Sequence, residues 1–217
     1  MPALEGMSFD HVLLTTRAVR KRLDLHRPVE QEVLRECFEL AQQAPTQSDT
    51  QSFHFIVVTD KVQREALGEL FRRGHAIYKT LPGGVYGLKH SDMKQEATRL
   101  RIIKSLEHLV DHIHEVPVHV VPCVVGSTEG MPPASVSVLM GSVIPAAWSF
   151  MLAARSRGLG TCWTNLHMLL IEEADKVLGV PAGVMQVALI PTAYTIGRDF
   201  RPAYRRPLDE ILHQDRW

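Results

Sequence analysis

The stretch that decides the fold runs from residue 141 to residue 164 and reads GSVIPAAWSFMLAARSRGLGTCWT. Its first part, up to Ala154, belongs to a longer segment between Glu129 and Arg155 that contains no Asp, Glu, Lys or Arg. That length could cross a bilayer. Gly141, Pro145 and several serines interrupt it, however, which favours a helix over about residues 136–157 that is buried in protein. A helix that is apolar on every side must be covered on every side, and a second subunit is a natural cover.

The elements on both sides of this helix follow no regular strand–helix–strand alternation. On the N-terminal side, helical spacing predicts a helix from Val29 to Gln43 that ends before Pro45. Apolar, β-rich runs predict strands at Phe53–Val58, Val118–Val125 and Met185–Ile196. Further helices are predicted from a cap at Thr59-Asp60 to about Arg73, from a cap at Ser91 through Ile113, and at Ile171–Leu178. Gly158 is a natural C-cap for the uncharged helix. We therefore predict an α+β fold, with a mixed central β-sheet flanked by helices in a single domain over residues 1–217.

Two segments are predicted to lie outside the regular elements. Residues Gly74–His90 include one proline and three further glycines and are predicted to form a mobile loop. The tail from Arg198 to Trp217 carries several arginines and two prolines, which is typical of an extended arm.

Composition narrows the possible partners and the compartment. Lys+Arg and Asp+Glu both number 24, so the net charge gives no sign of nucleic acid or of an acidic membrane surface as a partner. Three widely spaced cysteines, Cys37, Cys123 and Cys162, argue against a disulfide framework and fit a reducing cytoplasm. Residues Met1–Asp10 lack the basic and apolar regions of a signal peptide. We expect a cytoplasmic chain without a membrane span.

Three segments could hold a ligand, and each has a simpler explanation. The basic run from Thr16 to Arg22 could bind phosphate, since Arg presents a planar fork of donors, or could be a solvated face. The polar loop Ala44–Ser52 could read the edge of a heterocycle or be an ordinary turn. The segment Gly158–Asn165 allows close approach of backbone to a ligand, but lacks the third glycine of a dinucleotide fingerprint.

Histidines offer a further possibility. His108 and His112 are spaced by four residues, as zinc ligands can be, and His114 follows closely. No glutamate follows His108 directly, so the HExxH motif is absent. We expect exposed histidines and no metal, with a metal-binding protein kept as an alternative.

In their order and spacing these motifs resemble the nitroreductase family of FMN enzymes. The resemblance covers nearly the whole chain except about residues 71–96. It is carried by the motifs TRAVR at 16–20, APTQSDTQ at 44–51, GSVIPAAW at 141–148, GLGTCWT at 158–164 and RRPLDEI at 205–211.

This resemblance implies an entwined homodimer with two FMN sites at the interface, the uncharged helix at the dimer centre and the 198–217 arm reaching across the partner. Arg17 and Arg205 look like ligands of the FMN phosphate, and Arg20 like the cation beside N1 and O2 of the flavin, where reduction leaves negative charge. The cofactor-binding residues implied by position are Thr16, Arg17, Ala18, Val19, Arg20, Thr46, Ser48, Asp49, Gln51, Trp163, Thr164, Asn165 and Arg205.

Some positions depart from the family. A further basic residue is common where Thr16 stands, serine where Ala18 stands, and asparagine where Asp49 stands. An ionised carboxylate cannot donate a hydrogen bond, so the role of Asp49 is an open question.

The implied activity is an NAD(P)H oxidoreductase that reduces nitroaromatics, quinones or similar electron-poor acceptors by a ping-pong mechanism, with the chemistry carried by FMN. Residues 71–96 are then a variable lid, with Phe71, Tyr78 and Tyr86 as candidates to stack on the acceptor. Within the same fold, a dehalogenase, a flavin-cleaving enzyme or a protein that stores or senses FMN without turnover are the alternatives.

Overall fold

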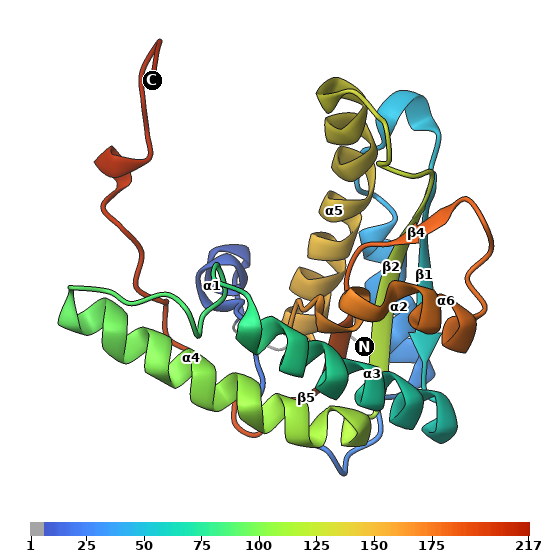
Figure 1. Cartoon of the computed structure of the whole chain (residues 1–217), viewed down its shortest axis with the longest axis horizontal. Coiled ribbons are helices and arrows are strands. Elements are labelled where there is room, and N and C mark those ends of the chain that lie inside the picture. Colours follow the sequence, from blue (N-terminus) through green and yellow to red (C-terminus); the bar gives the residue numbers. More distant parts are fainter. Residues whose placement is uncertain (1–6) are drawn as a thin grey trace.

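The computed structural model describes residues 7–217 of the chain. The first part of the Met1–Asp10 stretch therefore lies outside the described residues. The architecture is α+β, as predicted: a five-stranded sheet with helices on both faces (Figure 1). The strands are β1 (Phe53–Val58), β2 (Val118–Val125), β3 (Leu159–Thr161), β4 (Val184–Gln186) and β5 (Ile190–Tyr194). The helices are α1 (Phe9–Thr15), α2 (Gln31–Ala41), α3 (Lys61–Thr80), α4 (Met93–His112), α5 (Pro133–Ser156) and α6 (Ile171–Leu178), with short 3-10 turns η1 (Gln47–Asp49), η2 (Ile113–Glu115), η3 (Leu166–Leu170) and η4 (Leu208–Glu210).

The sheet is built almost entirely from antiparallel pairs. Its order is β1-β2-β5-β3, with β4 also pairing β2, and each of these ladders is antiparallel. Parallel pairing appears as an isolated bridge between Ala18 and Thr161. The sheet was predicted to combine parallel and antiparallel pairs; among the described residues, the parallel part is this bridge.

The single strand predicted at Met185–Ile196 is two strands, because the chain leaves the ladder between them. β2 pairs Cys123 with Gln186 and Val120 with Ile190, so three residues of one strand face two of the other. One extra residue of this kind is a β-bulge, which bends the strand and increases its twist. Pro122 lies opposite the bulge, and its carbonyl accepts a hydrogen bond from the N–H of Val187 at 2.8 Å.

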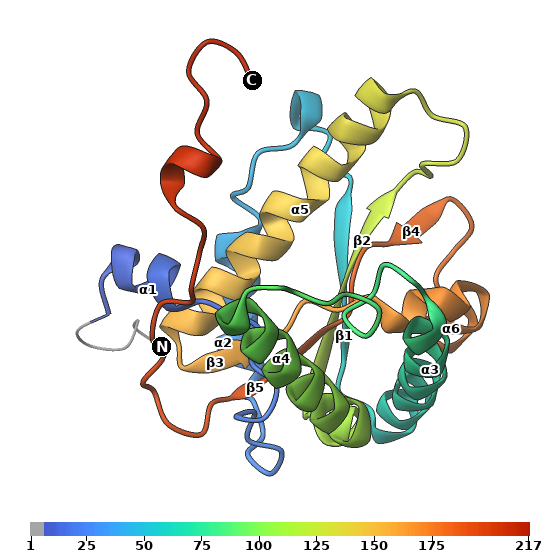
Figure 2. The same ribbon diagram turned by 60° about the vertical axis from the view of Figure 1, so that its left-hand side comes forward.

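Two hydrophobic clusters lie on opposite faces of β2, because successive side chains of a strand point to opposite faces. Val118 and Val120 pack with α2 and α5, whereas Val121 and Cys123 pack with α3 and α4. β2 is therefore covered on both faces (Figure 2).

The uncharged helix, α5, is only partly covered by the rest of the described chain. Its C-terminal half supplies buried residues such as Phe150 and Ala154, while Val138, Ile144 and Trp148 are 39%, 42% and 41% exposed. In the part of the chain that the structure describes, α5 is the one helix long and apolar enough to cross a membrane, and 39% of its most apolar window is buried. A core helix passes the same test of length and composition, so this finding alone is weak evidence for a span.

Two predictions about the region between α3 and α4 are wrong. Residues 74–80 are the last turns of α3 rather than a loop, since Gly74 packs directly against the backbone of Leu166. The cap of α4 is Asp92, whose side chain accepts a hydrogen bond from the N–H of Gln95 at 2.7 Å, and not Ser91. The cap predicted at Thr59-Asp60 is confirmed, with Asp60 accepting from the N–H of Gln63.

The tail after Gly197 is an extended arm, as predicted. In both views it runs away from the body of the molecule (Figures 1 and 2). Its apolar side chains Leu208, Ile211 and Leu212 are 55–65% exposed.

Candidate functional site

The basic run that follows α1 is held along β3. Ser8 caps α1, and the Thr16 hydroxyl donates to the carbonyl of Val12 at 2.7 Å, so that hydroxyl proton is already used. Ala18 forms a parallel bridge to Thr161, and the N–H of Val19 donates to the carbonyl of Thr161 at 2.8 Å. Val19 is buried in the core, and its neighbours Ala18 and Arg20 point to the opposite side because side chains alternate along an extended chain.

Arg20 is a partly buried cation with a donor to spare. Its Nη1 lies 3.4 Å from the hydroxyl of Ser105 on α4, and its Nε is buried without a hydrogen-bond partner among the described residues. It also reaches Cys162: burial raises the pKa of that thiol, and the nearby Arg20 charge opposes the rise. A buried guanidinium N–H without an acceptor costs free energy, which is the arrangement expected where a ligand completes a site.

Ser105 was not anticipated from the sequence. It faces Arg20 from α4, and no local motif marks it; only the packing of α4 brings it there.

The segment Trp163–Asn165 continues directly from β3, so the structure brings it beside the basic run. The backbone of Thr164 is paired in both directions with Leu189, at 3.0 and 2.7 Å. Its N–H is therefore not available to a ligand. Trp163 is half-buried, and Asn165 is exposed with its Nδ2 lying 3.4 Å from the carbonyl of Val187.

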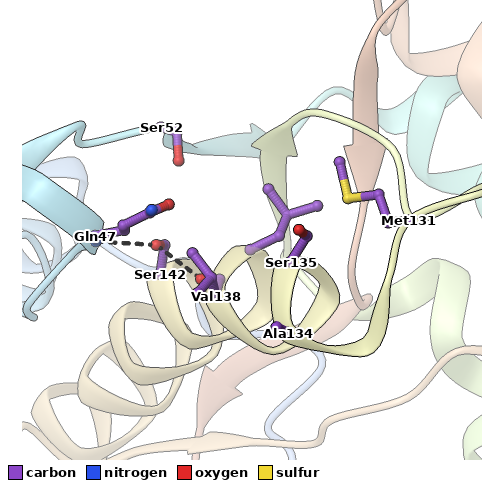
Figure 3. A pocket seen from close by; sticks show the side chains of 8 residues that line it. Gln47, Ser52, Met131, Ala134, Ser135, Val138 and Ser142 are labelled. Atoms are coloured by element: carbon purple, nitrogen blue, oxygen red, sulfur yellow. Dashed lines mark hydrogen bonds between the residues drawn. The ribbon is translucent and has the colours of Figure 1, made fainter.

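The polar loop lies on a different part of α5. The N–H of Gln47 donates to the Ser142 hydroxyl at 3.3 Å, which ties η1 to that helix (Figure 3). Ser48, Asp49 and Gln51 all have positive φ, a conformation that side chains with a Cβ rarely adopt. Asp49 accepts a hydrogen bond from Nε2 of Gln51 at 2.9 Å, so its carboxylate has a local partner.

A cavity of about 280 Å³ separates this loop from the first turns of α5. Four of its eight lining residues are polar, and three of these, Gln47, Ser52 and Ser142, lie at one side (Figure 3). The residues around it are Gln47, Ser52, Met131, Ala134, Ser135, Val138, Leu139 and Ser142.

The two halves of the predicted site are far apart within the chain. The loop contacts α5 at Ser142, whereas the end of α1 contacts α5 at Arg155, through a hydrogen bond of 3.2 Å from Arg155 Nη2 to Thr15 Oγ1. Thirteen residues of helix separate these two contacts, or about 20 Å at 1.5 Å per residue. Figure 2 shows η1 and α1 beside opposite parts of α5.

Burial separates the three residues predicted to stack on the acceptor. Phe71 is 0% exposed in the core below α3, so it presents no surface to an acceptor, and this prediction is wrong. Tyr78 and Tyr86 are half-buried and pack edge to face, with ring centroids 6.1 Å apart. The Tyr86 hydroxyl lies 2.7 Å from Nε2 of His75, and burial together with Glu107 raises the pKa of Tyr86 to about 12.

Arg205 lies on the arm, four residues after Arg201. It is exposed, and its Nη1 donates to the adjacent carbonyl of Tyr204 at 2.9 Å. Arg17 instead donates to the carbonyl of Arg201 at 3.2 Å, which places the beginning of the arm next to the basic run.

Two of the histidines considered as metal ligands contact each other. His112 and Glu115 are 2.7 Å apart and His108 stacks against His112, but no group of three or more His, Cys, Asp or Glu side chains in residues 7–217 is placed to hold an ion.

Comparisons with known proteins agree with this arrangement. The family model described as "Nitroreductase family" matches residues 13–194. An NADH dehydrogenase/NAD(P)H nitroreductase-type protein of Methanothermobacter thermautotrophicus is 23% identical over 94% of this chain and 84% of its own length.

Solved structures share the fold. An FMN-dependent nitroreductase from Mycobacterium smegmatis, in complex with NADPH, has a TM-score of 0.69 and 21% identity, covering 95% of this chain and 97% of its own. An iodotyrosine deiodinase bound to FMN and 3-iodo-L-tyrosine has a TM-score of 0.71 and 16% identity, covering 97% of this chain and 100% of its own. Identity this low shows the common fold and not the reaction. With the family model covering most of the sequence, from before the basic run to the end of β5, the chain belongs to the nitroreductase family.

Proposed function

We propose that this chain is an FMN-dependent NAD(P)H oxidoreductase that works as a homodimer and reduces nitroaromatics, quinones or similar electron-poor acceptors. Arg20 carries the proposal. Its buried, unpartnered Nε beside β3 fits a ligand that presents an acceptor, and FMN has such groups at the N1 and O2 edge of its ring.

The residues present suit the parts of FMN that the proposal assigns to them. Arg17 and Arg205 would hold the phosphate, since two guanidinium forks match its charge and geometry. Thr46, Ser48, Asp49 and Gln51 would hold the ribityl chain or the ring edge, and Trp163 and Asn165 would lie along the ring. When bound, FMN supplies the two-electron chemistry between NAD(P)H and the acceptor.

The chain's own contribution is binding and electrostatics. Arg20 is fixed by its contact with Ser105 and by packing beside Cys162, so its charge is already oriented before any negative charge develops. Pre-oriented charge in a site with little water stabilises an anion without the cost of reorganisation. Half-buried Tyr78 and Tyr86 would border the position of the acceptor, and NAD(P)H would leave that position before the acceptor enters.

An absorption spectrum of the purified full-length chain, taken before and after anaerobic NADPH and NADH, tests this function. We expect a flavin band that bleaches with reduced nicotinamide and returns when a nitroaromatic or quinone is added. Arg20→Ala should bleach more slowly and lower the reduction potential of the flavin, whereas Arg72→Gln on the surface of α3 should change neither. A colourless protein that cannot be loaded with FMN would overturn the proposal. A flavin that ignores both nicotinamides would favour storage or sensing instead.

The homodimer is proposed from the separation of the two half-sites. Arg20 and the 46–51 loop are assigned to the same cofactor, yet the end of α1, which leads into the basic run, and the loop contact α5 at points about 20 Å apart along the helix. Two protomers packed along α5 could pair the basic run of one with the loop of the other. The exposed apolar side chains Ile144 and Trp148, and those of the arm, are suited to such an interface.

Sedimentation of the full-length chain tests the dimer. We expect a mass of twice 24.4 kDa, and we expect Ile144→Asp to give a monomer that no longer retains FMN. Val62→Asp is the control, because Val62 is 72% exposed on α3 and lies away from α5. Monomeric wild-type protein that still binds FMN tightly would refute the dimer proposal.

Three free, buried cysteines are consistent with the proposed cytoplasmic location.

A further inference from the structure

Three arginines hold the beginning of the C-terminal arm by its backbone. We call residues 196–201 the arm root, and Arg17, Arg22 and Arg155 the arginine clasp. Arg22 donates from Nε to the carbonyl of Ile196 at 2.7 Å and from Nη1 to that of Asp199 at 2.8 Å. Arg155 lies 3.3 Å from the carbonyl of Arg198, and Arg17 donates to that of Arg201 at 3.2 Å. Four carbonyls within six residues are therefore engaged.

An aromatic ring locks the arm root between two members of the clasp. The guanidinium of Arg22 lies 4.2 Å from the centroid of the Phe200 ring, and that of Arg155 lies 4.7 Å from it. Both distances are within the range of cation–π attraction. Phe200 also packs against the core cluster that contains Val19, so the arm root is tied to the basic run through its side chain as well.

Gly197 allows the close approach. Its φ is +74°, and a Cβ at this position would lie 2.7 Å from Nη2 of Arg22. A larger residue would therefore have to displace the Arg22 guanidinium from the arm root, and the positive φ would strain the backbone. The glycine thus favours the clasp geometry without carrying any charge.

The clasp carries positive charge without an acidic partner. Arg155 is 3% exposed, its Nε and Nη1 have no partner, and none of the carboxylates in residues 7–217 is hydrogen-bonded to any of the three arginines. Backbone carbonyls supply only partial negative charge. A dianion close to Arg17 would therefore be favoured by all three guanidinium groups.

We propose that the arginine clasp positions the arm so that Arg17 and Arg205 share one phosphate site. This inference rests on the proposed FMN function. Arg17 would be a ligand of the phosphate, while Arg22 and Arg155 are positioning residues that act through the arm root. Arg205 follows Arg201 by four residues, which reach at most about 14 Å, so fixing the arm root confines Arg205 to the surroundings of Arg17.

The ratio of riboflavin to FMN dissociation constants isolates this role, because riboflavin lacks the phosphate. Both constants are measured by flavin fluorescence on the full-length chain after removal of bound flavin. Arg22→Gln and Gly197→Ala should each weaken FMN about tenfold and leave riboflavin unchanged. The first removes a charge, whereas the second keeps every charge and only disturbs the contact between Arg22 and the arm root. Arg72→Gln, which removes the same charge from α3, should change neither constant.

Trypsin provides a second readout, since a released arm root is cut after Arg198, whereas the Arg201–Pro202 bond resists trypsin. Both variants should be cut faster than wild type and Arg72→Gln. Faster cleavage with an unchanged ratio would overturn the inference, because the arm would then move without affecting the phosphate. An effect of Arg22→Gln alone would also overturn it, since charge and not position would be responsible. Wild-type protein that binds neither flavin would instead overturn the proposed function.

Discussion

Lowering the pH from 7.5 to 5.5 should destabilise the folded chain through two buried histidines. His119 and His167 are both 0% exposed. Nε2 of His119 lies 2.8 Å from the carbonyl of Ile113, Nε2 of His167 lies 3.1 Å from the side-chain oxygen of Gln186, and both Nδ1 atoms are buried without a partner. Burial lowers the pKa of each imidazole from 6.5 to about 4.

The direction follows from proton linkage. Since the folded pKa is depressed, the unfolded chain takes up protons first as the pH falls, and stability decreases between the unfolded and the folded pKa. With pKa values of 6.5 unfolded and about 4 folded, each histidine should lower the free energy of unfolding by ~1.4 kcal/mol between pH 7.5 and 5.5. The two together should cost roughly 3 kcal/mol, and His75 and His108, whose pKa values are also lowered by burial, act in the same direction.

Urea unfolding at one fixed protein concentration measures this loss. His119→Gln keeps a donor for the Ile113 carbonyl and cannot be protonated, so it should remove about half of the pH dependence. His54→Gln, at an exposed position on β1, should leave it intact. A free energy of unfolding that stays level or rises from pH 7.5 to 5.5 would refute the reasoning.

Three further predictions concern packing and capping. Phe71→Ala should lower the free energy of unfolding by about 3–5 kcal/mol, the usual cost of emptying a core site, as measured by urea unfolding; a loss below 1 kcal/mol would mean that the ring is not in the core. Asp92→Ala should cost about 1 kcal/mol through loss of the α4 cap, while Ser91→Ala should cost much less in the same assay, and the reverse ranking would restore Ser91 as the cap. Native protein should react with a thiol reagent such as dithionitrobenzoate only slowly at pH 8, because burial raises the pKa of Cys37 and Cys123 to about 11; rapid modification before unfolding would contradict their burial.

Local sequence patterns were sufficient where the element is short and bounded by turns. Phe53–Val58, Val118–Val125 and Ile171–Leu178 were predicted with the bounds that the structure has. Long-range contacts decided the rest. The bulge at Val187–Leu189 depends on pairing with β2, and the extension of α3 past Gly74 depends on packing against η3, so neither is visible in the local sequence.

The candidate site also has parts that local sequence predicted and parts that depend on long-range contacts. The sequence motifs located the basic run, the polar loop and the arm, and the structure brings the first of these beside Trp163–Asn165. The fit of Arg20 against Ser105 and the arginine clasp could not be predicted, since both join residues more than 40 positions apart. Arg155 had one signal in the sequence: it is the first charge after a long uncharged helix.

The length of α5 between Ser142 and Arg155 has a genetic consequence if each cofactor is shared by two protomers. Two alleles, one damaged at Arg20 and the other in the loop at Gln51, would each be inactive alone. Mixed dimers would place both lesions in one of the two sites and leave the other intact. Cells that express both alleles should therefore regain up to a quarter of the wild-type activity, the value for random assortment with one working site in each mixed dimer. Two alleles damaged in the same half should never complement each other.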